Sequence, residues 1–292
     1  MSDPPVTLDR AYASCERLAR RHYENFPVAS RMLPQDMRRH IAAVYAFARH
    51  ADDLADEGER SAQERVALLD DWQRRFHQTV DGSTTPSGAD DCDLLFVALA
   101  NTIRVRDLPP ELFTDLLSAF RQDVTVHRYR TWDDLLDYCR RSANPVGRLV
   151  LRIAGVRDAA ADASADDVCT ALQITNFLQD LGRDLARGRL YMPADVYEPF
   201  GAREEDLVRV PLSSPWRCTL AEVGQRTARL FDRGRTVSDR VGGRLGIELR
   251  LTWLGGRRIL DRLERNGYDP LVRRPSLGVS DYLPMLWHAL VW

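Results

Sequence analysis

Apolar residues recur every three or four positions along most of the chain, which is the spacing of amphipathic helices. No segment shows the alternation expected of a strand, and no repeat or long linker divides the sequence. The spacing predicts helices over residues 8–24, 35–57, 62–80, 92–105, 110–126, 131–141, 149–154, 164–184, 216–241, 247–266 and 280–291. We therefore expect an all-α protein of about ten helices, forming a single domain over residues 1–292.

Three segments interrupt the helical spacing. Glycine, proline, serine and threonine dominate residues 81–90, and two prolines and two glycines lie within residues 187–201. The run Asn144-Pro145-Val146-Gly147 is expected to kink or break a helix, because proline lacks the donor that the helix needs.

Composition narrows the possible functions. The 43 acidic and 41 basic residues give a net charge of −2, so no positive field predicts nucleic-acid binding. All 41 basic residues are arginines, which excludes Schiff-base and P-loop lysine chemistry. Five scattered cysteines without a CxxC pair predict reduced thiols and a cytoplasmic location. We find neither a secretory signal nor an apolar run long enough to span a membrane.

The first candidate for chemistry is the acidic end of the helix predicted over residues 35–57, with the sequence ARHADDLADEG. Asp52 and Asp56 are four residues apart, which places them about 40° apart and about 6 Å along the helix axis. Both carboxylates can then reach one divalent cation or two adjacent ones. The preceding turns are almost wholly apolar and the helix macrodipole disfavours negative charge at this end, so we expect a cation to meet these acids. The alternative is a solvated acidic helix end.

A second stripe lies in the sequence QITNFLQDLGRDLARGRL. Asn176, Asp180 and Asp184 are spaced four residues apart and form a row about 12 Å long. Two carboxylates and an amide oxygen are ligands suited to Mg²⁺. Three arginines surround the acids: Arg183, Arg187 and Arg189. Acids and guanidinium groups in this combination hold a metal-bridged diphosphate, although a purely structural stripe is an equal alternative when it is considered alone.

These two motifs occur in the order typical of the squalene/phytoene synthase family of head-to-head prenyl transferases. RRHYENFPVASRMLP precedes them and DLLDYCRRSANPVGRLVLRIAG lies between them, so the sequence resembles this family over residues 20–193. The resemblance implies a single isoprenoid-synthase domain built around a central apolar cavity. It also implies two aspartate-rich motifs that face each other across the cavity mouth and bind a prenyl diphosphate with Mg²⁺. Enzymes of this family use three Mg²⁺ ions.

Site residues follow from this resemblance position by position. It implies metal-binding and catalytic roles for Asp52, Asp56, Asn176, Asp180 and Asp184. It implies contacts with the diphosphate or the prenyl chain for Tyr45, Arg49, Phe26, Tyr138 and Gln173, and Arg189 is a further candidate.

One branch of the family fits best. ENFPVAS, ARHADDLADEG and CRRSANPVG resemble the bacterial hopanoid-pathway enzymes that convert presqualene diphosphate to hydroxysqualene. The resemblance then implies loss of diphosphate, rearrangement of a carbocation and capture by water, without NADPH. Aromatic faces such as Phe26, Phe47 and Tyr45 would stabilise the cation. Asn144 is our candidate for holding the water, and the alternative is that it caps the following helix.

Two other functions stay open at this stage. The first is head-to-head condensation of two farnesyl or geranylgeranyl diphosphates. Gln179 and Arg183 stand where the family commonly has arginine and glutamate, and these departures weaken the case for condensation. The second is a non-catalytic scaffold that has kept the fold, although both acidic stripes are whole.

The last segment, SDYLPMLWHALVW, is amphipathic. We expect it to pack on the domain, and the alternative is peripheral contact with the inner face of the membrane. The oligomeric state is left open.

Overall fold

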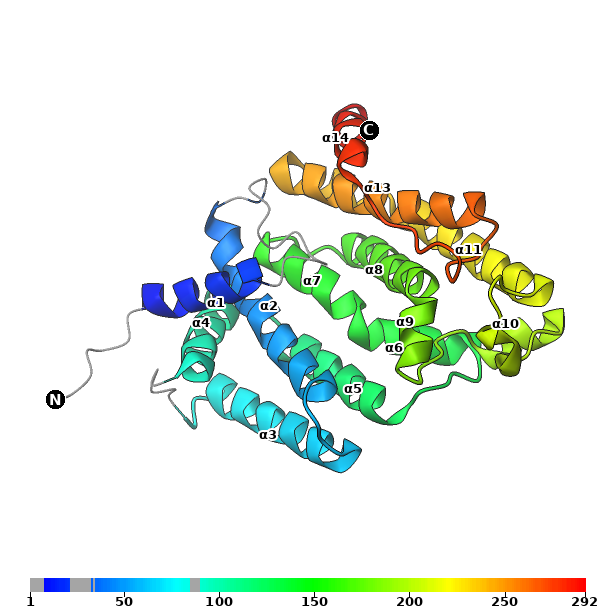
Figure 1. Cartoon of the computed structure of the whole chain (residues 1–292). Coiled ribbons are helices and arrows are strands. Elements are labelled where there is room, and N and C mark those ends of the chain that lie inside the picture. The colour runs from blue at the N-terminus through cyan, green and yellow to red at the C-terminus, as the bar shows by residue number, and fades with distance from the viewer. Residues whose placement is uncertain (1–7, 22–32, 34, 85–89) are drawn as a thin grey trace. The chain divides into compact units, whose positions relative to one another are not determined.

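The computed structural model describes residues 8–21, 33, 35–84 and 90–292, and this part of the chain is α-helical (Figure 1). Its helices are α1 (Leu8–Arg21), α2 (Gln35–Asp56), α3 (Ala62–Val80), α4 (Asp91–Arg106), α5 (Pro110–Thr125), α6 (Trp132–Ser142), α7 (Asn144–Ile153), α8 (Ala159–Gln179), α9 (Leu181–Ala186), α10 (Ala194–Tyr197), α11 (Ser214–Gly234), α12 (Val237–Val241), α13 (Gly243–Arg265) and α14 (Val279–Val291). Two short 3₁₀ segments and one isolated bridge between Arg128 and Leu190 complete the regular structure of the described residues. The all-α prediction is confirmed.

The chain groups into two compact units. Unit 1 comprises residues 1–125 and 148–157, and unit 2 comprises residues 126–147 and 158–292, so the boundary falls within α7. The single domain and the central cavity expected from the sequence stay predictions.

Unit 1 has an aromatic core. Phe47 on α2 is fully buried, with its ring centroid 5.2 Å from that of Phe76 and 5.4 Å from that of Phe113. It also stacks against Trp72 at 5.7 Å. Phe47 is therefore part of the core of unit 1, and the suggestion that it faces a carbocation stays a prediction.

Local sequence signals set several helix starts. At α3, the Ser61 side chain accepts from the Glu64 N–H while Glu64 accepts from the Ser61 N–H. Thr131 and Asp134 form the same reciprocal pair at the start of α6. Asp134 thus caps α6, and Asp137 pairs with Arg140 and Arg141 on the same helix.

The break expected at residues 144–147 falls at Ala143, which separates α6 from α7, and residues 144–147 form the first turn of α7. Gly147 is required there, because a Cβ atom at this position would lie 2.6 Å from the Cys169 sulfur of α8. Pro145 and Gly147 thus end one helix and let the next approach α8 closely.

In unit 2, α8, α11 and α13 lie side by side, drawn in green, yellow and orange in Figure 1. Two predicted helices are each divided in the structure. The helix expected over residues 164–184 begins earlier, at Ala159, because the Asp158 side chain caps the N–H groups of Ala160 and Ala161. It also ends at Gln179, before a separate α9. The helix expected over residues 216–241 is divided into α11 and α12, since α11 ends at Gly234.

Among the described residues, no helix has both the length and the apolar character needed to cross a membrane.

Candidate active site

The first acidic stripe lies on the last turns of α2, in unit 1. Asp52 and Asp56 are both half-buried. Arg49, one turn earlier, places guanidinium nitrogens 3.2 Å from an Asp52 oxygen, 2.5 Å from Asp53 and 3.1 Å from Glu57. Burial alone would lower the pKa of Arg49, but Asp53 and Asp52 raise it. The cation expected beside these acids is thus, at least in part, Arg49 itself.

Arg65 on α3 fixes the end of α2. Its guanidinium donates to the carbonyl oxygens of Ala55 at 2.7 Å, Glu57 at 3.2 Å and Gly58 at 2.7 Å. These carbonyls lie at the C-terminal end of the helix, where a positive charge is favourable. Arg65 therefore holds the turn that presents Asp52 and Asp56. Sequence reasoning missed this residue, because the cap comes from the next helix.

Two aromatic groups lie near the first stripe. Burial raises the pKa of Tyr45, with Asp52 and Asp53 adding to the effect and Arg49 opposing it. The His50 ring stacks on Trp72 at 4.1 Å between centroids, and burial lowers its pKa. His50 is thus a packed, half-buried side chain.

The second acidic stripe, in unit 2, crosses the junction of α8 and α9. The Asp180 N–H donates to the Asn176 carbonyl at 2.8 Å, and the Asp184 N–H donates to the Asp180 carbonyl at 3.0 Å. These consecutive backbone bonds keep the three residues one turn apart, although the helix is interrupted at Asp180. The predicted spacing of the stripe is therefore preserved. Asn176 is exposed, whereas Asp180 and Asp184 are half-buried.

The segment between α13 and α14 packs against this stripe. Arg274 donates to both oxygens of Asp180, at 2.5 and 3.2 Å, and Arg183 lies 3.5 Å from the same carboxylate. The neighbouring Gln179 donates to the Pro275 carbonyl at 2.7 Å. Arg274 is a site residue that sequence reasoning missed, because it lies 94 positions after Asp180.

An aromatic cluster lies directly beside the second stripe. The Phe177 and Tyr191 rings stack at 3.8 Å with an interplanar angle of 7°. Tyr138 lies 6.1 Å from Phe177 and 5.9 Å from Tyr191, and Tyr129 lies 5.7 Å from Tyr138. All four rings are buried. The sequence pointed to Tyr138 alone, since Tyr191 lies in an irregular stretch without periodicity.

The other predicted residues are distributed around unit 2. Gln173 on α8 and Arg189 after α9 are half-buried, and the Arg189 N–H donates to the Asp184 carbonyl at 2.8 Å. Asn144 is buried and begins α7, and its side-chain oxygen accepts from the Thr170 hydroxyl at 2.9 Å. Phe26 lies outside the described residues.

The donor chemistry of both stripes fits a hard, oxygen-seeking ion such as Mg²⁺, because carboxylate and amide oxygens are its usual protein ligands. Within the described part of the chain, no group of three or more His, Cys, Asp or Glu side chains forms a metal site by itself. The metal ligands named from the sequence stay predictions.

The all-α fold with two aspartate-rich helix ends has the character of an isoprenoid synthase. The chain belongs to the squalene/phytoene synthase family, whose model matches residues 19–281.

Three relatives show which members of that family the chain is similar to. A hydroxysqualene synthase of Zymomonas mobilis is 37% identical, with 91% of this chain and 86% of the relative covered. A 15-cis-phytoene synthase of Synechococcus elongatus is 29% identical, with coverage of 92% and 89%. Among solved structures, the crystal structure of squalene synthase HpnC from Alicyclobacillus acidocaldarius matches this chain with a TM-score of 0.83. The two sequences are 42% identical, with 91% of this chain and 98% of that chain covered.

Proposed function

We propose that this protein converts presqualene diphosphate to hydroxysqualene with the help of Mg²⁺, in hopanoid and squalene synthesis. The observation that carries this proposal is the identity of 37% over nine-tenths of the chain to a hydroxysqualene synthase. The second acidic stripe, formed by Asn176, Asp180 and Asp184 with aromatic rings packed beside it, supports the proposal independently.

The reaction requires a stabilised leaving group. Asp52, Asp56, Asn176, Asp180 and Asp184 would hold the metal ions. Bound Mg²⁺ supplies the positive charge that stabilises the departing diphosphate. In the proposed reaction the carbon–oxygen bond breaks and its electron pair leaves with the diphosphate. Guanidinium groups donate hydrogen bonds to the oxygens of this leaving group, and no protein nucleophile is needed.

Arg49 and Arg274 are the guanidinium groups best situated for this role. Each pairs with an acid of one stripe, at Asp52 and Asp180 respectively. An arginine that already lies beside these acids can donate to the diphosphate without a long movement. Arg189 and Gln173 are further donors in the proposal.

The carbocation would be stabilised by the ring faces of unit 2. Tyr138, Phe177 and Tyr191 offer π-surfaces that attract positive charge and exclude water. After opening of the cyclopropane ring, one water oxygen forms the new carbon–oxygen bond. The proton of that water is lost to the diphosphate or to solvent, so water and presqualene diphosphate give hydroxysqualene and diphosphate. No NADPH takes part in this proposal.

Head-to-head condensation of prenyl diphosphates is the second candidate, supported by the likeness to a phytoene synthase. Gln179 argues against it. Where the family commonly has arginine, this side chain binds the Pro275 carbonyl and carries no guanidinium to a second diphosphate.

To test the proposal, the purified protein is incubated with Mg²⁺ and presqualene diphosphate, with and without NADPH. The products are identified by chromatography. We expect hydroxysqualene in both cases. Asp52→Asn and Asp180→Asn should each lower kcat/KM at least about 100-fold with helicity unchanged, because each removes a metal ligand. The exposed acid Asp71, paired with Arg74, serves as a control, and Asp71→Asn should retain activity.

Three results would contradict the proposal. Consumption of farnesyl diphosphate with no turnover of presqualene diphosphate would identify a condensing enzyme. Full activity of both stripe variants would refute the metal assignment, and no turnover of either substrate by the wild type would favour a scaffold.

We also propose that the protein works at the cytoplasmic face of the inner membrane, as a peripheral protein. The reason is chemical, since a C30 substrate and its product partition into lipid.

A further inference from the structure

Helix α14 carries its apolar residues on the outside. Its outward residues with large apolar side chains are Val279, Tyr282, Leu283, Leu286, Trp287, Leu290 and Val291. Leu283 is 79% exposed and Trp287 is 65% exposed. A surface helix of a soluble protein normally turns polar residues outward, so this arrangement indicates that something covers the helix.

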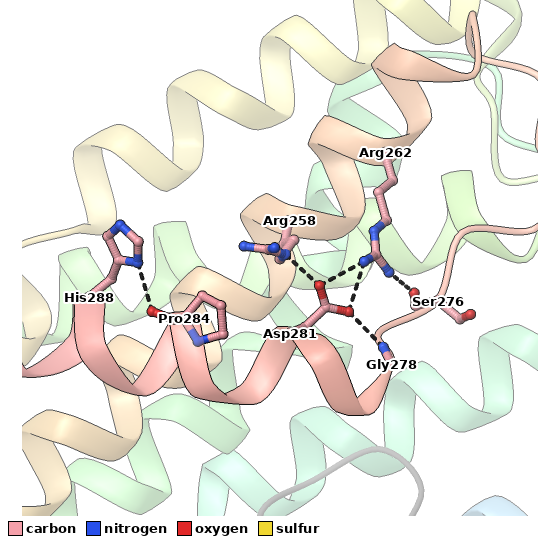
Figure 2. Close-up of polar contacts among 7 residues, drawn as sticks. All are labelled: Arg258, Arg262, Ser276, Gly278, Asp281, Pro284 and His288. Atoms are coloured by element: carbon pink, nitrogen blue, oxygen red, sulfur yellow. Dashed lines mark hydrogen bonds and ion pairs between the residues drawn. The ribbon is translucent and has the colours of Figure 1, made fainter.

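The inward side of α14 carries the charge instead. Asp281 is 1% exposed and is the only acid of the helix. Its carboxylate accepts from Arg258 at 2.6 Å, from Arg262 at 2.7 and 2.8 Å and from the Gly278 N–H at 2.6 Å (Figure 2). Three charge-assisted bonds from α13 therefore hold α14 in one orientation, and the bond from Gly278 caps the start of α14 itself.

The outward residues form one continuous surface. At 100° per residue, the seven side chains fall within about half of the helix circumference. We call this surface, formed by the seven residues named above, the α14 face. Two of its members, Tyr282 and Trp287, are aromatic residues of the kind enriched at lipid headgroup level.

Positive charge lies at the C-terminal end of the α14 face. A pocket of about 520 Å³ is lined by Arg235, Thr236, Asp239, Arg250, Leu290, Val291 and Trp292. The exposed Arg235 guanidinium lies 4.5 Å from the centroid of the Trp292 ring. Arg250 pairs with Asp239 at 3.1 Å, and its guanidinium also lies 5.5 Å from the centroid of the Trp292 ring. The chemistry of the pocket suits the phosphate of a lipid headgroup.

We propose that the α14 face docks on the surface of an anionic phospholipid membrane, with Arg235 and Arg250 at the headgroup phosphates. The aliphatic and aromatic side chains would enter the headgroup boundary while the helix lies in the plane of the membrane. The α14 face would thus be the surface by which the protein takes the peripheral location proposed above. A role of this face in delivering substrate rests on the proposed function.

A second copy of the chain is a poorer occupant. Stable protein interfaces use about 20–30 residues on each side, whereas the α14 face has seven. An apolar self-contact also gives Arg235 no anionic partner.

The test measures co-flotation of the full-length protein with vesicles of phosphatidylethanolamine and phosphatidylglycerol, and with vesicles of phosphatidylcholine alone. We expect stronger binding to the anionic vesicles. The double variant Leu283→Ser/Trp287→Ser should weaken binding at least about tenfold, because both exposed side chains are lost. Arg235→Gln should weaken binding about fivefold, on the anionic vesicles only.

Controls separate docking from folding and from catalysis. Val208 and Val210 are exposed apolar residues outside α14, and Val208→Ser/Val210→Ser should bind vesicles like the wild type. All variants should keep their helicity and their turnover of presqualene diphosphate in detergent micelles.

Four results would distinguish the alternatives. No binding of the wild type, or equal binding by Leu283→Ser/Trp287→Ser, overturns the docking proposal even if hydroxysqualene is formed in detergent. A wild-type dimer that the same double variant dissociates, without vesicle binding, overturns it in favour of a second copy. Vesicle binding as expected without turnover of presqualene diphosphate leaves docking supported and overturns the proposed reaction alone.

Discussion

The carboxylate of Asp180 shows how one residue can serve two partners. It is a predicted metal ligand, yet Arg274 donates to both of its oxygens. A guanidinium and Mg²⁺ compete for the same lone pairs, so Arg274 has to yield to a metal ion. In the proposed reaction, Arg274 would then donate to the diphosphate.

Replacement of Arg274 tests this exchange. Arg274→Gln removes the competing cation from Asp180, so we expect the half-saturating Mg²⁺ concentration to fall about threefold or more. Turnover at saturating Mg²⁺ should fall as well, because a donor to the diphosphate is lost. Steady-state rates across a magnesium titration measure both effects.

An arginine with no role at Asp180 provides the comparison. Arg233 pairs with Asp167 elsewhere in unit 2, and Arg233→Gln should leave the magnesium curve unchanged. An Arg274→Gln curve identical to that of the wild type would mean that Arg274 does not compete for Asp180.

At the scale of elements, the junction of α7 with α8 links packing to the proposed chemistry. Gly147 lets the helices approach, and the bond from Thr170 to Asn144 joins them in the interior. This bond gives Asn144 a structural role that differs from the helix cap considered from the sequence. The proposed water-holding role of Asn144 is separate from this structural role.

Paired substitutions separate the two roles of Asn144. Asn144→Ala leaves the Thr170 hydroxyl without its acceptor, so we expect the free energy of unfolding to fall by about 1–3 kcal/mol. Urea denaturation measures this change. Thr170→Val removes the same bond while keeping Asn144. A loss of hydroxysqualene yield in Asn144→Ala alone would support the water-holding role, and equal yields in both variants would contradict it.

At the scale of the whole molecule, the pH dependence of stability follows from a buried polar group in unit 1. His40 is 1% exposed, and its ring nitrogen lies 3.2 Å from the Tyr12 hydroxyl and 3.0 Å from that of Thr102. This network joins α1, α2 and α4. Burial lowers the pKa of His40 from 6.5 to about 4, with Arg106 and Arg39 adding to the effect.

The pKa of His40 predicts acid sensitivity. Between pH 6.5 and 4 the unfolded chain binds a proton that the folded chain does not, so stability is complete above pH 6.5 and falls as the pH falls through this window. The contribution is about 3 kcal/mol at most. Urea denaturation of His40→Asn should show a smaller loss between pH 7 and 4.5 than the wild type.

An exposed histidine serves as the control for this measurement. His77 lies on α3 at the surface, and His77→Asn should keep the pH dependence of the wild type. The assignment to His40 is contradicted if His40→Asn loses as much stability as the wild type over the same range.

The sequence alone determined the features that local physics controls. Apolar spacing defined most helices, with α3 starting and ending at the predicted residues Ala62 and Val80. The spacing of Asn176, Asp180 and Asp184 survived a helix break that the sequence did not predict, because the stripe depends on backbone bonds between residues four apart. Motif order also indicated the family.

Only the tertiary structure decided contacts that join distant parts of the chain. Arg65 at the end of α2, Arg274 on Asp180 and Tyr191 on Phe177 all come from other segments, and no local pattern marks them. Phe47 shows the converse, because an aromatic residue near a motif has the same local signal whether it faces a site or the core. The C-terminal helix makes the same point. Its sequence is amphipathic either way, and the buried pairs of Asp281 decide that the apolar side faces outward.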